Sequence, residues 1–541
     1  MSRKTTRSVN RGAIVVLALI TGALGLVVPT SSAVAAPAPA PKAPAPVAWE
    51  QCPAGELTGV PPAELPLYSC ANYAVPLDHE HPKKGTINLA LMRRAANDQA
   101  HRVGSLFLNP GGPGGSGFGM PKAGRNIFEP QVLDRFDLIG FDPRGVARST
   151  PLRCFATQED ADDVFGRMAV LPVTAQEEKT TTKALKDYGK FCGRFAGPLL
   201  DHMSTEDVAQ DLDMLRAAVG DQKLTYVGFS YGTMLGATYV NMFPKNARAI
   251  ILDGNVDPRL RVLDGVEYDK QRTDGGFQYS FENFLTRCDS DPDCSFRGDA
   301  RAKFTALHNY LRNVGPITLS DGSAWDEGAV ISTVAGVLYS PEDFAPLADL
   351  LQALYDTSHP SVARKAVTVS AAQSRSLLAK AQLAKRDMRP DSPYTSDDSY
   401  AAVNCSDKPF NNTLGEMPRI ADQWERQIPD FGRYGAWGDP AICPAWPVQD
   451  ADAYRGPWNH RTATPVLLFG NYYDPATQYK FAQRMSRELG NARLVSVDSF
   501  GHCILGGSQC TDKIAADYLI DLALPGPNTV CHPDVQPFPA E

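Results

Sequence analysis

The chain has 541 residues, 43% of them hydrophobic, with a net charge of −8 and a pI near 5.7. This length and apolar content suffice for a large core or two domains, whereas the negative charge, with no basic block after the N-terminal segment, excludes a protein that binds nucleic acid through its charge. Eleven cysteines indicate an oxidising compartment, and no C-x-x-C or H-E-x-x-H pattern occurs, so we expect neither a metal nor another cofactor.

The first 35 residues are typical of an export signal. Four basic residues precede the apolar run 13–28, and Ala33-Val34-Ala35 offers a cleavage site between small residues. The run is too short to favour a membrane span, so we expect a secreted, extracellular protein without stable membrane insertion, with association with the cell wall as an open alternative. Residues 36–50, rich in alanine and proline, are predicted to form an extended spacer or pro-segment.

The next elements are two strands and a glycine-rich loop. A half-exposed strand is predicted over 86–92, and a buried strand over 105–109 runs directly into the loop 110–117. Glycines allow backbone N–H groups to approach a ligand closely. A phosphate cradle would need the lysine and hydroxyl residue of a P-loop, which are missing, so we favour the first loop of an oxyanion hole. A flexible linker is disfavoured directly after a buried strand.

A third strand is predicted over 136–141, closed by a turn in which Arg144 is expected to tie the loop to an acid. The stretch 151–201 is predicted to be a helical insertion. Ser204 then begins a helix as its N-cap, with an acidic first turn and one apolar stripe.

The stretch Leu224–Thr233 contains a G-x-S-x-G pattern centred on Ser230. A β-branched strand precedes it, and a helix of small residues follows over 234–240. This arrangement is typical of a nucleophile elbow, a strained turn that exposes the serine hydroxyl at the top of a sheet. The pattern alone can arise by chance, but the strand and helix around it favour a catalytic Ser230 over an ordinary turn serine.

After a strand over 247–252 the alternation of strands and helices stops. Residues 259–460 are predicted to form a mainly helical lid domain, after which strands over 464–470 and 492–497 complete the core. The core would therefore comprise 51–258 and 461–541. Alternating buried strands and helices predict an α/β fold with a doubly wound, mostly parallel sheet, in which ligands bind at the carboxyl ends of the strands.

A serine nucleophile needs a base, and the base needs an acid that orients it. Of the nine histidines, His502 alone follows a predicted core strand. Asp474 ends the preceding strand, and the chain order Ser, Asp, His is the order of the α/β-hydrolase fold. Asp253 and Asp257, one strand earlier, are rival acids.

The oxyanion hole would combine the backbone N–H of Tyr231 with that of Gly111 or Gly112, since Pro113 has no N–H to donate.

Three motifs together resemble those of the secreted tripeptidyl aminopeptidases, which belong to the proline iminopeptidase group of α/β-hydrolase serine peptidases; they are Asn109–Gly117, Gly140–Gly145 and Gly228–Thr233. Three later motifs look like the TAP-like C-terminal domain of that subgroup: Asn404–Asp407, Cys443–Pro447 and Asp474–Thr477. The resemblance implies an enzyme that releases N-terminal tripeptides, or similar short pieces, from peptides with a free amino end, in some relatives with proline at the cleaved position. It also implies Ser230 as nucleophile, Asp474 as acid and His502 as base. Separately, we expect the protein to be a monomer.

Such an exopeptidase needs buried carboxylates to bind the substrate ammonium. The candidates are Glu206, Asp207, Glu267, Asp269 and Glu282. Two alternatives use the same three side chains, a proline iminopeptidase and an esterase. A non-catalytic binding protein on a hydrolase scaffold is the remote alternative.

The spacing of the cysteines suggests five disulfides and leaves Cys503 unpaired, although sequence alone does not fix the pairing. The suggested pairs are Cys52–Cys70, Cys154–Cys192, Cys288–Cys294, Cys405–Cys443 and Cys510–Cys531. A cysteine directly after the candidate histidine departs from the family pattern.

Overall fold

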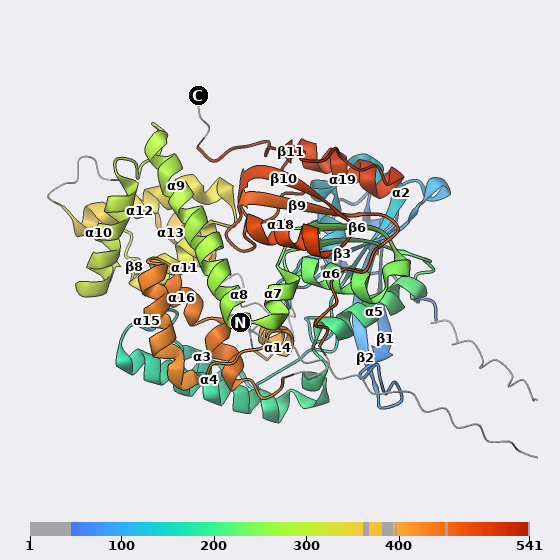
Figure 1. Cartoon of the computed structure of the whole chain (residues 1–541), viewed down its shortest axis with the longest axis horizontal. Coiled ribbons are helices and arrows are strands. Elements are labelled where there is room, and N and C mark those ends of the chain that lie inside the picture. The colour runs from blue at the N-terminus through green and yellow to red at the C-terminus, as the bar shows by residue number, and fades with distance from the viewer. Residues whose placement is uncertain (1–44, 361–366, 381–392, 395–397, 450–452, 539–541) are drawn as a thin grey trace, which may run out of the picture. The chain divides into compact units, whose positions relative to one another are not determined.

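Nine strands form one sheet in the order β1-β2-β4-β3-β5-β6-β9-β10-β11 (Figure 1). β2 pairs antiparallel with both β1 and β4, and every other pair in the sheet is parallel. The predicted doubly wound, mostly parallel sheet is therefore confirmed. Its strands are β1 (Tyr68–Pro76), β2 (Thr86–Arg94), β3 (Gly104–Asn109), β4 (Phe136–Phe141), β5 (Leu224–Phe229), β6 (Ala247–Asp253), β9 (Val466–Tyr473), β10 (Ala492–Phe500) and β11 (Val530–Cys531).

The computed structural model describes residues 45–360, 367–380, 393–394, 398–449 and 453–538. The predicted export signal and most of the spacer lie outside the described residues. The last part of the spacer differs from the prediction, because Val47 is buried and its N–H donates to Ala218 O at 3.1 Å. No helix among the described residues is both long and apolar enough to cross a membrane.

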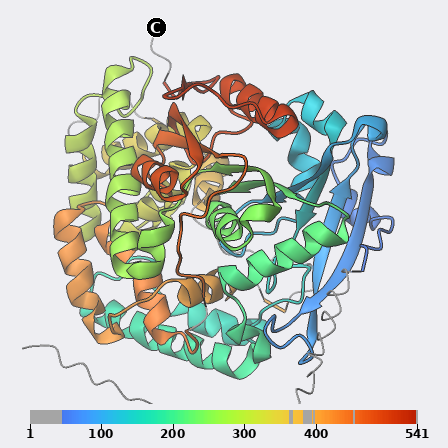
Figure 2. The same cartoon turned by 45° about the vertical axis from the view of Figure 1, so that its right-hand side comes forward.

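The sheet has one strand that the sequence analysis does not predict. Residues 68–76 form β1, and this strand pairs with β2 over its whole length. The pair lies at one edge of the sheet, where Figure 2 shows it in blue. Cys70 lies within β1 and joins the strand to Cys52.

Helices cover both faces of the sheet because side chains of successive strand residues point to opposite faces. In β3, Phe107 packs in one apolar cluster, whereas Leu106 and Leu108 pack in another. The first cluster includes side chains of α5 (Thr205–Ala218), α6 (Gly232–Met242) and α18 (Tyr479–Glu488). The second includes side chains of α1 (Met120–Ile127), α2 (Pro130–Arg135) and α19 (Gln509–Asp521).

The segments between β4 and α5 and between β6 and β9 are mainly helical. After β4 come α3 (Gln158–Gly166) and α4 (Ala175–Phe195). Between β6 and β9 lie α7 (Pro258–Leu263), α8 (Gly265–Arg272), α9 (Tyr279–Ser290), α10 (Ala300–Asn313), α11 (Glu327–Val337), α12 (Phe344–Ser358), α13 (Ala371–Lys380), α14 (Asp398–Asp407), α15 (Met417–Gln427), α16 (Gly432–Ala436) and α17 (Asp439–Ile442), with the short pair β7 (Ile317–Thr318) and β8 (Ala324–Trp325).

The longer of these helical segments has its own apolar core. Phe281, Phe304 and Trp325 are buried in it, and Phe500 from the end of β10 joins the same cluster. The helical segment therefore packs against the sheet at the strand end from which the loop of His502 departs.

All five suggested disulfides form in the structure, and among the cysteines of the described residues Cys503 is the free thiol. The pairing could be suggested from the sequence because each disulfide joins two cysteines that are close in the chain, 6 to 38 residues apart.

Arg144 ties the turn after β4 to α5, as predicted. The fully buried guanidinium donates to both carboxylate oxygens of Asp211, each at 2.8 Å, and to the carbonyls of Pro76, Leu77 and His202. Burial opposes ionisation of Asp211, but the adjacent Arg144 charge holds the pKa of that carboxyl below its usual value. This ion pair therefore joins β1, the turn after β4 and α5.

Replacement of Arg144 tests how much the fold depends on this pair. Arg144→Leu leaves the buried Asp211 carboxylate without its guanidinium partner and with His79 Nε2, at 2.8 Å, as its remaining contact. The substitution is expected to lower the free energy of unfolding by about 3–5 kcal/mol, measured by urea denaturation. The control is Arg148→Leu, whose partner Glu56 is 26% exposed and whose loss should cost about 1 kcal/mol or less. Equal losses in the two variants would contradict this account.

Candidate active site

The turn around Ser230 has the geometry of a nucleophile elbow. Ser230 has a φ of +57°, in the left-handed region that non-glycine residues rarely adopt. A Cβ added at Gly228 would lie 2.3 Å from Gly232 O, and one added at Gly232 would lie 2.9 Å from Asn109 O, so both glycines of the motif are sterically required. The Ser230 N–H donates to Asp253 O at 2.8 Å, which holds the turn against the end of β6.

The glycine-rich loop after β3 lies directly against this elbow. A Cβ added at Gly111 would lie 2.8 Å from Ser230 Cβ and 2.9 Å from Tyr231 N. The Gly111 N–H donates to Asn109 Oδ1 at 2.9 Å and is therefore already occupied. Within the described part of the chain, the N–H groups of Tyr231 and Gly112 donate to no other group. Of the two glycines predicted as the second oxyanion donor beside Tyr231, Gly112 is therefore the one whose N–H group has no other acceptor.

Asp474 and His502 form a buried pair at the ends of β9 and β10. The two Asp474 oxygens lie 3.0 and 2.9 Å from His502 Nδ1. Asp474 also accepts the N–H groups of Ala476 and Thr477, at 2.8 and 2.7 Å, and the Thr477 hydroxyl at 2.9 Å. These bonds fix the carboxylate, so the imidazole it orients is fixed as well.

The other ring nitrogen of His502 is buried and has no hydrogen-bond partner among the described residues. A buried polar atom without a hydrogen-bond partner destabilises the fold. Such an atom therefore indicates a function, here contact with a substrate. The ring lies beside the elbow, since a Cβ added at Gly254 would be 3.0 Å from His502 Cε1, and the preceding residue, Asp253, holds the Ser230 N–H. Ser230, Asp474 and His502 thus follow the carboxyl ends of three parallel strands, β5, β9 and β10, and lie on the same side of the sheet.

The two rival acids have other partners. The Asp253 carboxylate accepts backbone N–H groups of Ile504 and Leu505. Asp257 caps α7 through the Leu260 N–H and pairs with Arg484 at 2.9 Å. Of the three acids considered, Asp474 is therefore the one hydrogen-bonded to the His502 ring.

The helical segment between β6 and β9 contacts the histidine directly. Tyr339, between α11 and α12, accepts the His502 N–H with its carbonyl at 3.0 Å, and its ring meets the imidazole edge-on with centroids 5.1 Å apart. Burial raises the pKa of the Tyr339 hydroxyl, and the Arg272 charge partly opposes this effect. Sequence reasoning missed Tyr339, because nothing in its segment identifies which lid residue reaches the site.

Two other residues of the site were also missed. Asn109 ends β3 directly after three apolar residues, and a polar residue at that position is a sequence signal that its side chain has a role. Thr477 lies in the turn Asp474–Thr477 and contacts both Asp474 and, at 3.3 Å, His502 Nδ1. A hydroxyl three residues after a strand-end aspartate is typical of a side chain that closes the turn.

The five carboxylates predicted to bind an ammonium group do not gather at one place. Asp207 pairs with Arg144, Asp269 with Lys408, and Glu282 with Arg301. Glu267 accepts a hydrogen bond from Gln271. Glu206 follows Thr205, whose hydroxyl bonds to that of Tyr231, the residue after Ser230.

Cys503 lies next to the histidine but is not placed as a nucleophile. Its thiol donates to Asp253 O at 3.4 Å. Burial raises the pKa of this thiol well above its usual value, so it stays protonated and weakly reactive.

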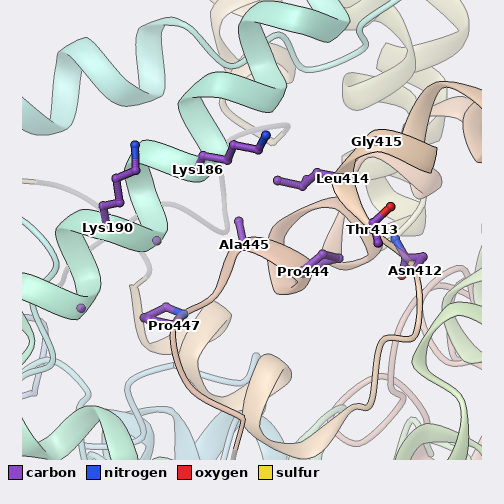
Figure 3. A pocket seen from close by; sticks show the side chains of 11 residues that line it. Lys186, Lys190, Asn412, Thr413, Leu414, Gly415, Pro444, Ala445 and Pro447 are labelled. Atoms are coloured by element: carbon purple, nitrogen blue, oxygen red, sulfur yellow. The ribbon is translucent and has the colours of Figure 1, made fainter.

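An open groove of about 580 Å³ lies away from these residues (Figure 3). It runs between α4 and the loops 412–415 and 444–447, and Lys186 and Lys190 stand along its helical side. No residue of the elbow, the glycine-rich loop or the Asp474–His502 pair lines it. No group of three or more potential metal ligands occurs in the part of the chain that the structure describes.

Comparison with known proteins agrees with this geometry. The family model described as "alpha/beta hydrolase fold" matches residues 104–344, and the one described as "TAP-like protein" matches 428–531. The serine protease Hip1 of Mycobacterium tuberculosis is 31% identical over 90% of this chain and 91% of its own. The tripeptidyl aminopeptidase of Streptomyces lividans is 28% identical over 91% and 88%, and carboxylesterase B of M. tuberculosis is 31% identical over 87% and 88%.

The close approach of the glycine-rich loop to the elbow is tested by Gly111→Ala. The added Cβ collides with the turn and displaces the Tyr231 N–H, so labelling of Ser230 by a fluorophosphonate should slow on the order of 10²-fold. Gly59→Ala is the matched control, because Gly59 has a similar φ of +84° but nothing within 4 Å of an added Cβ. Equal labelling rates in the two variants would show that the approach has no effect on the serine.

Proposed function

Because this chain belongs to the TAP-type α/β hydrolases and is a serine peptidase, we propose that it is an exopeptidase that releases N-terminal tripeptides, or similarly short peptides, from substrates with a free amino end. The single observation that carries the proposal is the buried His502 ring, oriented by Asp474 at one nitrogen and unpartnered at the other, beside the Ser230 elbow. The relatives named as a serine protease and a tripeptidyl aminopeptidase support the substrate class.

In the proposed mechanism, Ser230 Oγ attacks the scissile carbonyl carbon while His502 Nε2 takes the hydroxyl proton. Asp474 stabilises the imidazolium through Nδ1. The N–H groups of Tyr231 and Gly112 donate to the oxyanion of the tetrahedral intermediate, and each such donor typically contributes on the order of 10²–10³ in rate.

Collapse of this intermediate breaks the C–N bond, and His502 returns its proton to the leaving amine. The N-terminal fragment is then an ester on Ser230. Water deprotonated by His502 hydrolyses the ester and restores the free serine.

The length of the released piece would be set by the helical segment over the site. Tyr339 of this segment contacts His502, so the segment borders the position that a substrate bound at Ser230 would occupy. Among the carboxylates predicted to bind the substrate ammonium, Glu206 is the one whose neighbour contacts Tyr231. Release from a cell, with residues 1–35 as the signal, is also part of the proposal, and the five disulfides support it.

A panel of chromogenic substrates tests the proposal. The wild-type protein should cleave a free-amino tripeptide amide faster than its N-blocked form and faster than the corresponding single amino-acid amide, because the blocked form lacks the ammonium group and the single residue fills less of the site. Ser230→Ala should reduce turnover of all three by on the order of 10⁶, since the nucleophile is removed.

Three results would contradict the proposal. Equal cleavage of free and blocked tripeptides would exclude an aminopeptidase. Faster release of single residues would indicate an iminopeptidase, and hydrolysis of short-chain esters without cleavage of any peptide would indicate an esterase, the activity in the name of one relative.

A further inference from the structure

Asp253 is a buried carboxylate at the centre of the site for which the mechanism has no use. It ends β6, which lies between β5, the strand of Ser230, and β9, the strand of Asp474. Its side chain is fully buried. A buried carboxylate is costly unless it is paired or hydrogen-bonded, so its retention at this position calls for a specific partner.

Its partner is the loop that carries the histidine. Asp253 Oδ2 accepts the N–H groups of Ile504 and Leu505, each at 2.9 Å. The Asp253 carbonyl accepts the Ser230 N–H and the Cys503 thiol. Asp253 therefore holds the backbone next to both Ser230 and His502. Its carbonyl binds the serine turn, and its carboxylate binds the histidine loop.

The rest of the histidine loop is held from the neighbouring elements. Asn471 in β9 donates to the carbonyls of Gly501 and Cys503, at 3.0 and 2.9 Å, and the His502 N–H donates to Tyr339. The two N–H groups after Cys503 depend on Asp253. Without the carboxylate, Ile504 N–H would lose its acceptor in a buried position, and the loop would have to shift to satisfy it.

We propose that Asp253 is a positioning residue that holds the His502 loop so that the imidazole stays aligned with Ser230. The inference rests on the proposed serine mechanism. It assigns to Asp253 a role distinct from that of the acid, which the hydrogen bonds give to Asp474. A displacement of about 1 Å in such a pair can cost on the order of 10² in rate.

The electrostatics of the loop give this role a signature in the pH profile. Burial raises the pKa of Asp253 to about 6, and the N–H groups of Ile504 and Leu505 partly oppose this effect. The other titratable groups facing it are the His502 imidazole and Cys503 thiol on the loop after β10, and the Asp474 carboxylate after β9. The charge of a protonated His502 lowers the pKa of the Asp253 carboxyl, so the two charges attract each other.

The experiment compares Asp253→Ala and Asp253→Asn with wild type, using p-nitrophenyl acetate so that the result does not depend on peptide specificity. Asp253→Ala removes the acceptor and should lower kcat on the order of 10²-fold with little change in KM. In Asp253→Asn the amide oxygen can take both N–H groups, so kcat should stay within about threefold of wild type. The acidic limb of kcat/KM should nevertheless move to lower pH, because a neutral amide no longer stabilises the imidazolium.

Controls separate this role from general destabilisation. Asp257→Asn alters another buried aspartate, which caps α7 and pairs with Arg484, and should leave the acidic limb in place. If Asp253→Ala does not fold, the shift in Asp253→Asn and its rate of fluorophosphonate labelling carry the test.

A wild-type kcat in Asp253→Ala, or an unmoved acidic limb in Asp253→Asn, would overturn the proposal. A loss on the order of 10⁴ in Asp253→Asn would also overturn it and make Asp253 the acid. Turnover that survives in Ser230→Ala would instead refute the proposed function, whatever Asp253 does.

Discussion

The site depends on how closely the Ser230 turn approaches its two neighbouring strand ends. The serine adopts a left-handed conformation that its side chain disfavours, and such strain persists only where surrounding contacts hold it. Here the contacts are the hydrogen bond from Ser230 N–H to Asp253 O and the packing of Gly111 against the elbow. Because β3, β5 and β6 are parallel neighbours, Gly111, Ser230 and Asp253 all lie at the carboxyl ends of these strands.

Asp474 and His502 lie at the carboxyl ends of the next two strands, β9 and β10. Asp474 is fixed by the turn that follows it, and His502 is fixed by groups from three elements, the turn after β9, the end of β6 and the helical segment. The helical segment therefore has two roles in this account. It contacts His502 through Tyr339, and in the proposed mechanism it also limits which substrates enter the site.

The sheet and the proposed reacting residues could be predicted because their signals are local. The G-x-S-x-G turn needs glycines for steric reasons that hold in any chain, and His502 follows a strand that its apolar pattern identifies. The supporting residues could not be predicted in this way. Asp253 and Tyr339 act on a loop about 250 and 160 residues away in the chain, and their partners follow from strand order and lid packing, which sequence periodicity does not give. The five carboxylates show the same limit, since three of them are paired with basic side chains that lie far from them in the sequence or in other elements.

In the proposed mechanism, Ser230 carries the N-terminal fragment as an ester during turnover. The most direct measurement is rapid acid quenching of the wild-type protein during cleavage of a free-amino tripeptide substrate, followed by mass mapping of its peptides. We expect an added tripeptidyl mass on the peptide that contains Ser230. An adduct on another residue, or no adduct under conditions where the rate of hydrolysis of the ester limits turnover, would contradict it.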